Sequence, residues 1–77
     1  MITEALNRAF YEGRRSSELP LVLNDAVTVI VGAKSGASAC VIAPQSIQPD
    51  ASYLIEYEDG SSEVRSIREL SYDLPVA

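Results

Sequence analysis

The sequence predicts a mainly β protein: a five-stranded, partly open barrel preceded by one amphipathic helix. Three observations predict this class. Short runs rich in Val, Ile and Tyr recur along residues 27–67, separated by Gly, Pro, Asn and Asp. Before them, apolar residues recur at steps of three and four, as on one face of a helix. The length of 77 residues allows one domain, near the small end of what a hydrophobic core supports.

Residues 3–14 are expected to form the helix. Its apolar stripe consists of Ile2, Ala5, Leu6, Ala9 and Phe10. Thr3 can cap the N-terminus, and Gly13 can end the helix. Tyr11 falls nearly opposite the stripe, so we expect its side chain to be exposed. Residues 1–18 therefore form a helix with a polar connector, and residues 19–77 form the barrel.

The barrel elements follow in order. Residues 19–23 are apolar and contain Pro20, which predicts an edge strand or an arm across the core. Strands are expected at 27–31, 37–43, 53–58 and 63–67, then a short 3₁₀ turn at 68–70 and a terminal strand or tail at 72–76. Loops rich in Gly, Pro and Ser at 32–36 and 44–51 separate them. The pair Asp59–Gly60 is a strong hairpin signal between the third and fourth strands.

The register of that hairpin can be argued from charge. A two-residue turn would place Glu56 opposite Glu63, and like charges in cross-strand pairs repel. A four-residue loop over 59–62 places Glu56 opposite Arg65 instead, a pair worth about 0.2–1 kcal/mol. We therefore expect the longer loop.

Both faces of the predicted sheet are apolar. One set, the expected interior, is Val27, Val29, Val31, Ala39, Val41, Ala43, Ile55, Tyr57 and Val64. The other contains Ile30, Cys40, Ile42, Leu54 and Ile67. Burial of each of these five is worth about 1.5–3 kcal/mol, so we expect something to cover them. The helix, from the same chain or from a second copy, and the arm at 19–23 are the candidates.

The net charge of −5 lies in the last 28 residues. Residues 1–49 carry four acids and four bases, whereas residues 50–77 carry seven acids and two bases. This balance opposes binding to a phosphate backbone, so nucleic acid is not expected as a partner. Two interpretations of the acidic segment stay open: a solubilising surface, or a face for a basic partner.

Composition also limits the chemistry. The chain has no histidine and one cysteine, which excludes ordinary zinc sites and histidine-based acid–base catalysis. Cys40 lies among apolar residues and is expected to be a buried small hydrophobe. We expect no cofactor, no metal and no enzymatic activity. No stretch approaches the apolar length of a membrane span, so a soluble, cytoplasmic protein without membrane contact is expected.

Two stretches resemble SH3-like small barrels. Val27, Val29, Ile30, Gly32, Lys34, Gly36 and Val41 resemble a KOW segment, and Tyr53, Ile55, Tyr57, Asp59, Gly60, Val64 and Leu70 resemble the third and fourth strands of Tudor-like barrels. The resemblance implies the fold rather than a function. KOW modules that bind RNA have basic loops, whereas here the first loop has only Lys34. Tudor-like readers use several aromatics in a cage, and the loop at 32–36 has none.

These features predict a non-catalytic protein-interaction or scaffold module that associates with itself as a homodimer or with another protein. The candidate interface residues are Leu6, Phe10, Tyr11, Leu54 and Ile67, with Leu6 and Phe10 as helix anchors and Leu54 and Ile67 as their receiving surface. The alternative is a KOW-like, RNA-associated module that contacts RNA through Arg14, Arg15, Lys34, Arg65 and Arg68. A small enzyme or a metal-binding protein comes third.

Overall fold

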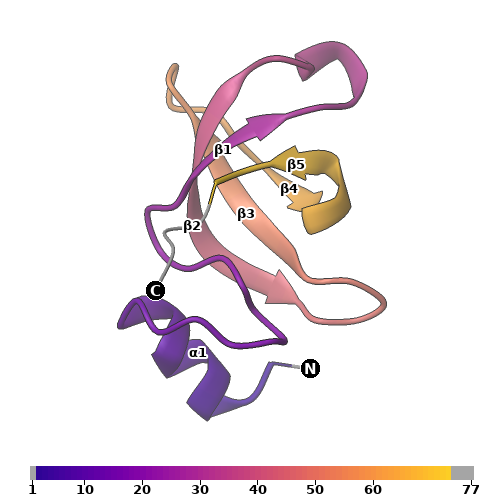
Figure 1. Cartoon of the computed structure of the whole chain (residues 1–77). Helices are drawn as coiled ribbons and strands as arrows, with labels where there is room; N and C mark the ends of the chain where they lie inside the picture. Colours follow the sequence, from indigo (N-terminus) through magenta and orange to yellow (C-terminus); the bar gives the residue numbers. More distant parts are fainter. Residues whose placement is uncertain (1, 74–77) are drawn as a thin grey trace.

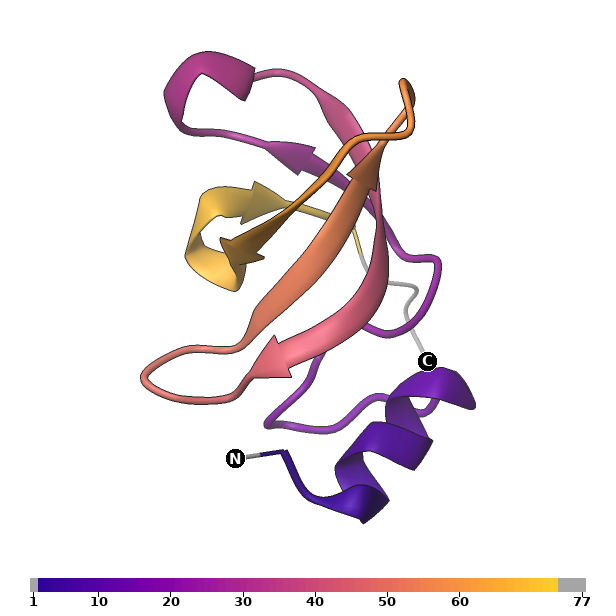
Figure 2. The same cartoon turned by 180° about the vertical axis from the view of Figure 1, so that it is seen from behind.

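The structure is a computed structural model, and it describes residues 2–73. Its elements are α1 (Glu4–Tyr11), β1 (Ala26–Val29), the 3₁₀ helix η1 (Gly32–Lys34), β2 (Ser38–Ser46), β3 (Ser52–Tyr57), β4 (Ser62–Ser66), the 3₁₀ helix η2 (Ile67–Glu69) and β5 (Leu70–Ser71). The five strands form one antiparallel sheet in the order β4-β3-β2-β1-β5. The sheet curls without closing, since β4 and β5 stand at opposite ends of this order (Figures 1 and 2). The predicted fold class, a mainly β, partly open barrel with an N-terminal helix, is confirmed.

Helix α1 begins after the predicted Thr3 cap and ends at Tyr11, three residues earlier than the predicted end at 14. The Thr3 hydroxyl accepts a hydrogen bond from the Leu6 N–H (3.1 Å), and Gly13 follows the helix with φ of +78°. The helix buries Phe10 completely, and the Phe10 ring stacks on Tyr53 of β3 with centroids 6.2 Å apart. Figure 1 shows α1 at one end of the sheet rather than over one of its faces. The helix therefore packs within its own chain and closes the end of the barrel.

The segment between α1 and β1 is an arm, not an edge strand. Leu19, Leu21 and Val22 are buried in the core although the segment has no strand pairing. The Leu23 N–H donates to the Phe10 carbonyl (3.3 Å), which ties the arm to the helix. The arm thus fills the space between α1 and the sheet.

The core lies on the concave side of the sheet. It comprises Phe10, Leu19, Leu21, Val22, Val27, Val29, Ala39, Val41, Ala51, Tyr53, Ile55, Tyr57 and Leu70. Most of the predicted interior set is present. Tyr53, which the sequence analysis placed in neither apolar set, is among the largest fully buried side chains. Its position on β3 has the same parity as Ile55 and Tyr57, so strand alternation alone identifies it.

Three residues of the predicted interior lie elsewhere: Val31 and Val64 are exposed, and Ala43 pairs with Leu54 on the convex face. Val31 is 36% exposed because β1 ends at Val29, two residues earlier than expected. The Gly36 N–H donates to the Val29 carbonyl (2.7 Å), and Gly32 with φ of +71° turns the chain away from the sheet. Val64 is 48% exposed because it lies opposite Leu54, on the convex face.

The second apolar set is not covered by the helix. Cys40 is exposed, so the expectation of a buried small hydrophobe is wrong. It pairs with Glu56 across β2 and β3, on the convex face, and α1 lies at the end of the barrel instead. Ile30 is 48% exposed, whereas Ile42 and Leu54 are half-buried. Ile67 is half-buried and packs against the core from η2.

Strand β2 is longer than predicted. It runs through Pro44 to Ser46, into the segment 44–51 that was expected to be a loop. Register shifts between Val41 and Ala43 and between Pro44 and Ser46 interrupt its pairing with β3. Such bulges bend a strand and admit proline, so a long curved strand forms where the proline predicted a break.

The β3–β4 hairpin has a different register from the predicted one. Glu56 lies opposite Ser62, and Arg65 lies opposite Tyr53, so the expected pair of Glu56 with Arg65 is wrong.

The backbone conformation at Gly60 explains this register. Gly60 has φ of +88°, and its N–H donates to the Tyr57 carbonyl (3.0 Å). The Tyr57 N–H donates in turn to the Ser61 carbonyl (2.8 Å), which leaves a three-residue loop over 58–60. A three-residue hairpin loop commonly ends in a residue with a left-handed backbone, a conformation that glycine adopts without strain. The backbone, rather than the cross-strand charges, sets the register.

Candidate functional site

The described basic residues are almost all neutralised within the chain. All five arginines form ion pairs: Arg8 with Glu4, Arg14 with Glu12, Arg15 with Asp25, Arg65 with Glu63 and Glu69, and Arg68 with Asp50. Lys34 is the one basic residue of residues 2–73 outside an ion pair. The five residues of the RNA alternative therefore do not form a free basic surface: four of them face carboxylates of this chain.

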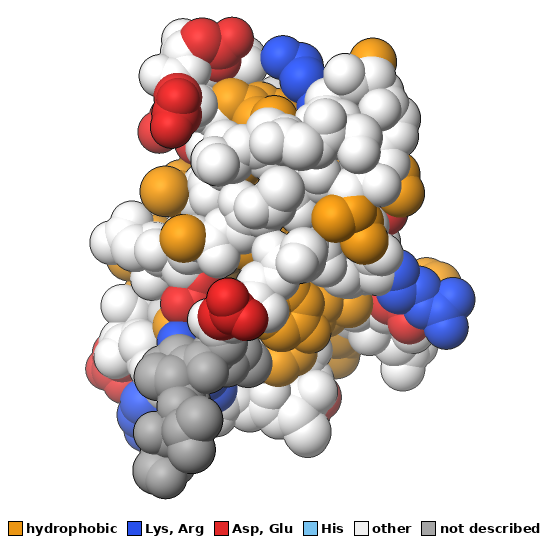
Figure 3. Space-filling model, turned by 45° about the horizontal axis from the view of Figure 1, so that its top comes forward, with side chains coloured by type: hydrophobic (Ala, Val, Ile, Leu, Met, Phe, Trp, Pro, Cys, Tyr) orange, Lys and Arg blue, Asp and Glu red, His pale blue; other side chains and the backbone are white. Residues whose placement is uncertain are grey.

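Most of the described acids without an ion pair belong to one hairpin. Within residues 2–73 the unpaired acids are Glu18, Glu56, Glu58, Asp59 and Asp73. Three of the five belong to the β3–β4 hairpin. Figure 3 shows acidic side chains at one end of the molecule, with a basic side chain across from them and hydrophobic surface between. Among residues 2–73, the charges outside ion pairs are therefore mostly negative, and the hairpin holds the largest group of them.

A polar cluster joins this hairpin to the open side of the barrel. The Tyr57 hydroxyl and the Arg65 Nε both donate to Glu63 Oε2, and Arg65 Nη1 donates to Glu69 (3.2 Å). The Glu69 carboxylate also accepts from the Ser66 N–H (2.9 Å), completing the cap of η2. Hydrogen bonding from Tyr57, followed by Arg65, lowers the pKa of Glu63, while burial and the bond to Glu63 raise the pKa of Tyr57. The cluster links the paired strands β3 and β4 to η2 through side chains.

A cleft lies beside this cluster, between the loop that holds η1 and the hairpin. We call it the hairpin cleft; it measures about 390 Å³ and is lined by Lys34, Gly36, Ala37, Ser38, Tyr57, Glu58 and Asp59. The Lys34 ammonium lies 4.9 Å from the centroid of the Tyr57 ring, within the range of a cation–π contact. The Asp59 carboxylate accepts hydrogen bonds from the Ser61 hydroxyl and N–H, which lower the pKa of Asp59. The cleft therefore combines an aromatic face, two carboxylates and one internal cation.

The convex face of the sheet carries an apolar stripe that reaches the hairpin. We call it the outer stripe; it consists of Ala26, Cys40, Ala43, Leu54 and Val64. Cross-strand pairing places Val64 beside Leu54 and Leu54 beside Ala43. Glu56 follows Leu54 on the same face of β3 and is exposed. An apolar surface and an unpaired carboxylate thus lie next to each other.

Arg15 belongs to a clamp that holds the arm. Its guanidinium donates to both carboxylate oxygens of Asp25 and to the Pro20 carbonyl (3.1 Å). Asp25 accepts a further bond from the Val22 N–H (2.7 Å). Partial burial raises the pKa of Asp25, but the bonds from Arg15 and Val22 outweigh it and hold the pKa below its ordinary value. Arg15 is committed to the arm and is not free for a partner.

The buried hydroxyl of Tyr53 completes the attachment of the arm. It accepts a hydrogen bond from the Leu21 N–H (3.1 Å), and desolvation raises the pKa of Tyr53 to about 12. Tyr53 therefore stays protonated at neutral pH and connects β3 to the arm as well as to Phe10.

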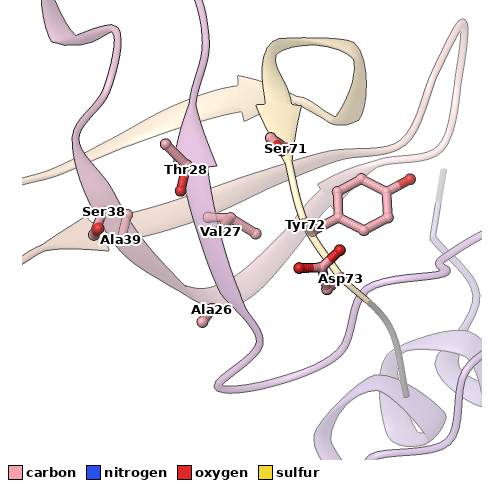
Figure 4. Close-up of a pocket in the computed structure, with 8 residues that line it drawn as sticks. All are labelled: Ala26, Val27, Thr28, Ser38, Ala39, Ser71, Tyr72 and Asp73. Atoms are coloured by element: carbon pink, nitrogen blue, oxygen red, sulfur yellow. The ribbon is translucent and has the colours of Figure 1, made fainter. Parts of the chain in front are cut away.

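A second hollow, of about 300 Å³, lies along β1 and the start of the C-terminal segment. Ala26, Val27, Thr28, Ser38, Ala39, Ser71, Tyr72 and Asp73 line it. Cross-strand pairing aligns the hydroxyls of Ser38, Thr28 and Ser71. Figure 4 shows that the Tyr72 ring points away from β1. The lining offers hydroxyls and one carboxylate, a set that suits hydrogen bonding.

The predicted interface residues lie in three separate places. Phe10 is buried, and Leu6 is half-buried against the core, so both anchors pack inside the chain. Tyr11 is 47% exposed, as expected from its position opposite the apolar stripe. Leu54 lies on the outer stripe and Ile67 against the core, whereas the sheet residue whose ring stacks on Phe10 is Tyr53. The structure therefore does not bring these five residues together on one surface.

Sequence reasoning missed the two features that make the hairpin end distinctive. One is the exposure of Val64 beside Leu54, which depends on the hairpin register. The other is the contact of Lys34 with Tyr57, which joins residues from two loops. A three-residue loop ending at Gly60 would have predicted the exposure of Val64. No local sequence pattern predicts the contact of Lys34 with Tyr57.

Comparison with known proteins gives no relative. Neither the protein-family models, nor the curated proteins, nor the solved structures compared with this chain match it. Within residues 2–73, no three Cys, Asp or Glu side chains are grouped so that they could hold a metal ion. In the same residues, no helix has both the length and the apolar character that crossing a membrane requires. Inference about function therefore starts from the surfaces of this chain.

Proposed function

We propose that this chain is a non-catalytic protein-interaction module that binds a basic partner segment with its outer stripe and hairpin. The observation that carries this proposal is the juxtaposition of Val64 and Leu54 with the unpaired carboxylates of Glu56 and Glu58. An apolar contact supplies affinity, and the acidic rim selects a partner of positive charge.

The charge of the chain favours a basic protein over a second copy. Two copies joined through this face would bring Glu56 and Glu58 of both molecules into the same interface, and like charges there oppose association. The helix offers no alternative anchor, since Phe10 is fully buried within its own chain. We therefore propose a partner with lysine or arginine beside apolar residues.

The test uses a short, fluorescently labelled peptide of alternating lysine and leucine, with a peptide of alternating glutamate and leucine for comparison. We expect the chain to bind the first peptide, more weakly as salt is added, and not the second. Val64→Lys removes an apolar contact and adds a repulsive charge, so it should weaken binding by about tenfold or more.

Tyr11→Lys is the matched control, because Tyr11 and Val64 are 47% and 48% exposed and lie on different elements. It should leave the affinity for the lysine–leucine peptide within about twofold of its original value. Equal binding of both peptides, or a larger loss with Tyr11→Lys than with Val64→Lys, would contradict the proposal. Sedimentation of the chain alone tests for the homodimer that the sequence predicts.

A further inference from the structure

The hairpin cleft already holds a cation of its own. The Lys34 ammonium lies over the Tyr57 ring at 4.9 Å from its centroid, and Glu58 and Asp59 line the same cleft. We propose that this cleft is a subsite for one basic side chain of the partner. We also propose that Lys34 of this chain competes with that side chain for the cleft. The inference deepens the protein-binding function proposed above and rests on it.

The negative charge of the carboxylates in the cleft exceeds the single positive charge of Lys34. Two carboxylates line the cleft against one ammonium, and neither forms an ion pair with Lys34. The nearby Glu63 carboxylate is already occupied by the Tyr57 hydroxyl and Arg65. An incoming cation therefore meets an aromatic face and unpaired acids, the surroundings that favour a lysine or an arginine.

The cleft can exchange its occupant without rearranging the fold. Lys34 sits on the exposed loop of η1, and its long side chain reaches the ring from outside the core. Tyr57 is held in place from its other end, since its hydroxyl donates to Glu63. A partner's cation can replace the ammonium over the ring while both loops keep their hydrogen bonds.

Lys34→Gln tests the competition directly. With the lysine–leucine peptide as the probe, removing Lys34 should tighten binding, because the Tyr57 ring becomes free and the Lys34 ammonium no longer repels the incoming cation. The matched control is Arg68→Gln, which also removes one positive charge but from an exposed side chain paired with Asp50. We expect Lys34→Gln to raise the affinity about twofold to fivefold more than Arg68→Gln does. Amide chemical shifts of residues 34–38 and 57–59 should move on peptide addition.

The outcomes separate this inference from the proposed function. If the peptide binds and Val64→Lys weakens it, but Lys34→Gln and Arg68→Gln tighten it equally, the competition is refuted and the proposed function stands. If the peptide binds without moving the amide shifts of the hairpin cleft, the subsite is likewise refuted. If the peptide does not bind at all, both proposals fail together.

Discussion

Single residues with unusual backbone angles decide where this chain turns. Gly60 is the clearest case, because its φ of +88° sets the three-residue hairpin loop and hence the face on which Val64 lies. A Cβ atom at Gly60 would meet no neighbouring atom within 4 Å. Any loss of stability caused by a side chain at Gly60 therefore comes from the backbone conformation and not from steric crowding.

Gly60→Ala should therefore destabilise the chain by about 1–2 kcal/mol, the cost of a left-handed backbone for a residue with a Cβ. Gly60→Asn should cost less, since asparagine adopts this conformation more readily than other non-glycine residues. Urea unfolding of both variants measures the difference. An alanine variant as stable as the wild-type chain would show that the loop has another conformation.

At the scale of elements, one partly buried ion pair contributes to holding the arm between α1 and β1. Arg15 and Asp25 are 31% and 16% exposed, and Asp25 also accepts the Val22 N–H. Asp25→Asn should lower the free energy of unfolding by about 1–3 kcal/mol at neutral pH, because it removes charge-assisted hydrogen bonds. Asp50→Asn, which breaks a pair with the 79% exposed Arg68, should cost under about 1 kcal/mol.

The pH dependence of this pair has a definite sign. The pKa of Asp25 lies below its ordinary value of 3.8 in the folded chain, so its stabilisation is fully present above that value. The stabilisation is lost as the pH falls through the folded pKa. The stability difference between the wild-type chain and Asp25→Asn should accordingly shrink below about pH 4. A constant difference from neutral to acidic pH would exclude an ionised Asp25 as its cause.

The sequence predicts a helix or strand correctly where the pattern that identifies it lies within that segment. The Thr3 cap, the stop at Gly13 and the alternation of β3 identify α1 and the core strand correctly. The length of β2 was not predictable from proline alone, because bulges carry the strand past Pro44. The exposure of Cys40 was also not predictable, since it depends on where α1 packs.

At the scale of the whole molecule, ion pairing occupies the arginines but leaves several acids unpaired. Every arginine faces a carboxylate of the same chain, whereas three unpaired acids remain on the hairpin. The sequence shows the acidic excess of the last 28 residues but not which of those acids stay free. That distinction arises from contacts made in the fold, such as those of Arg65 with Glu63 and Glu69 and of Arg68 with Asp50.

This distribution of charge leads to a prediction about RNA. Phosphate contacts come from free lysine and arginine side chains, and within residues 2–73 only Lys34 lies outside an ion pair. We expect no binding of a labelled single-stranded RNA oligonucleotide at about 50 mM salt, where electrostatic contacts are strong, because the chain also carries a net charge of −5. A charge-reversing variant, Glu58→Lys, should create weak binding that added salt removes, because it places a second cation beside Lys34. Salt-sensitive binding by the wild-type chain itself would show instead that its arginines leave their carboxylate partners for phosphate.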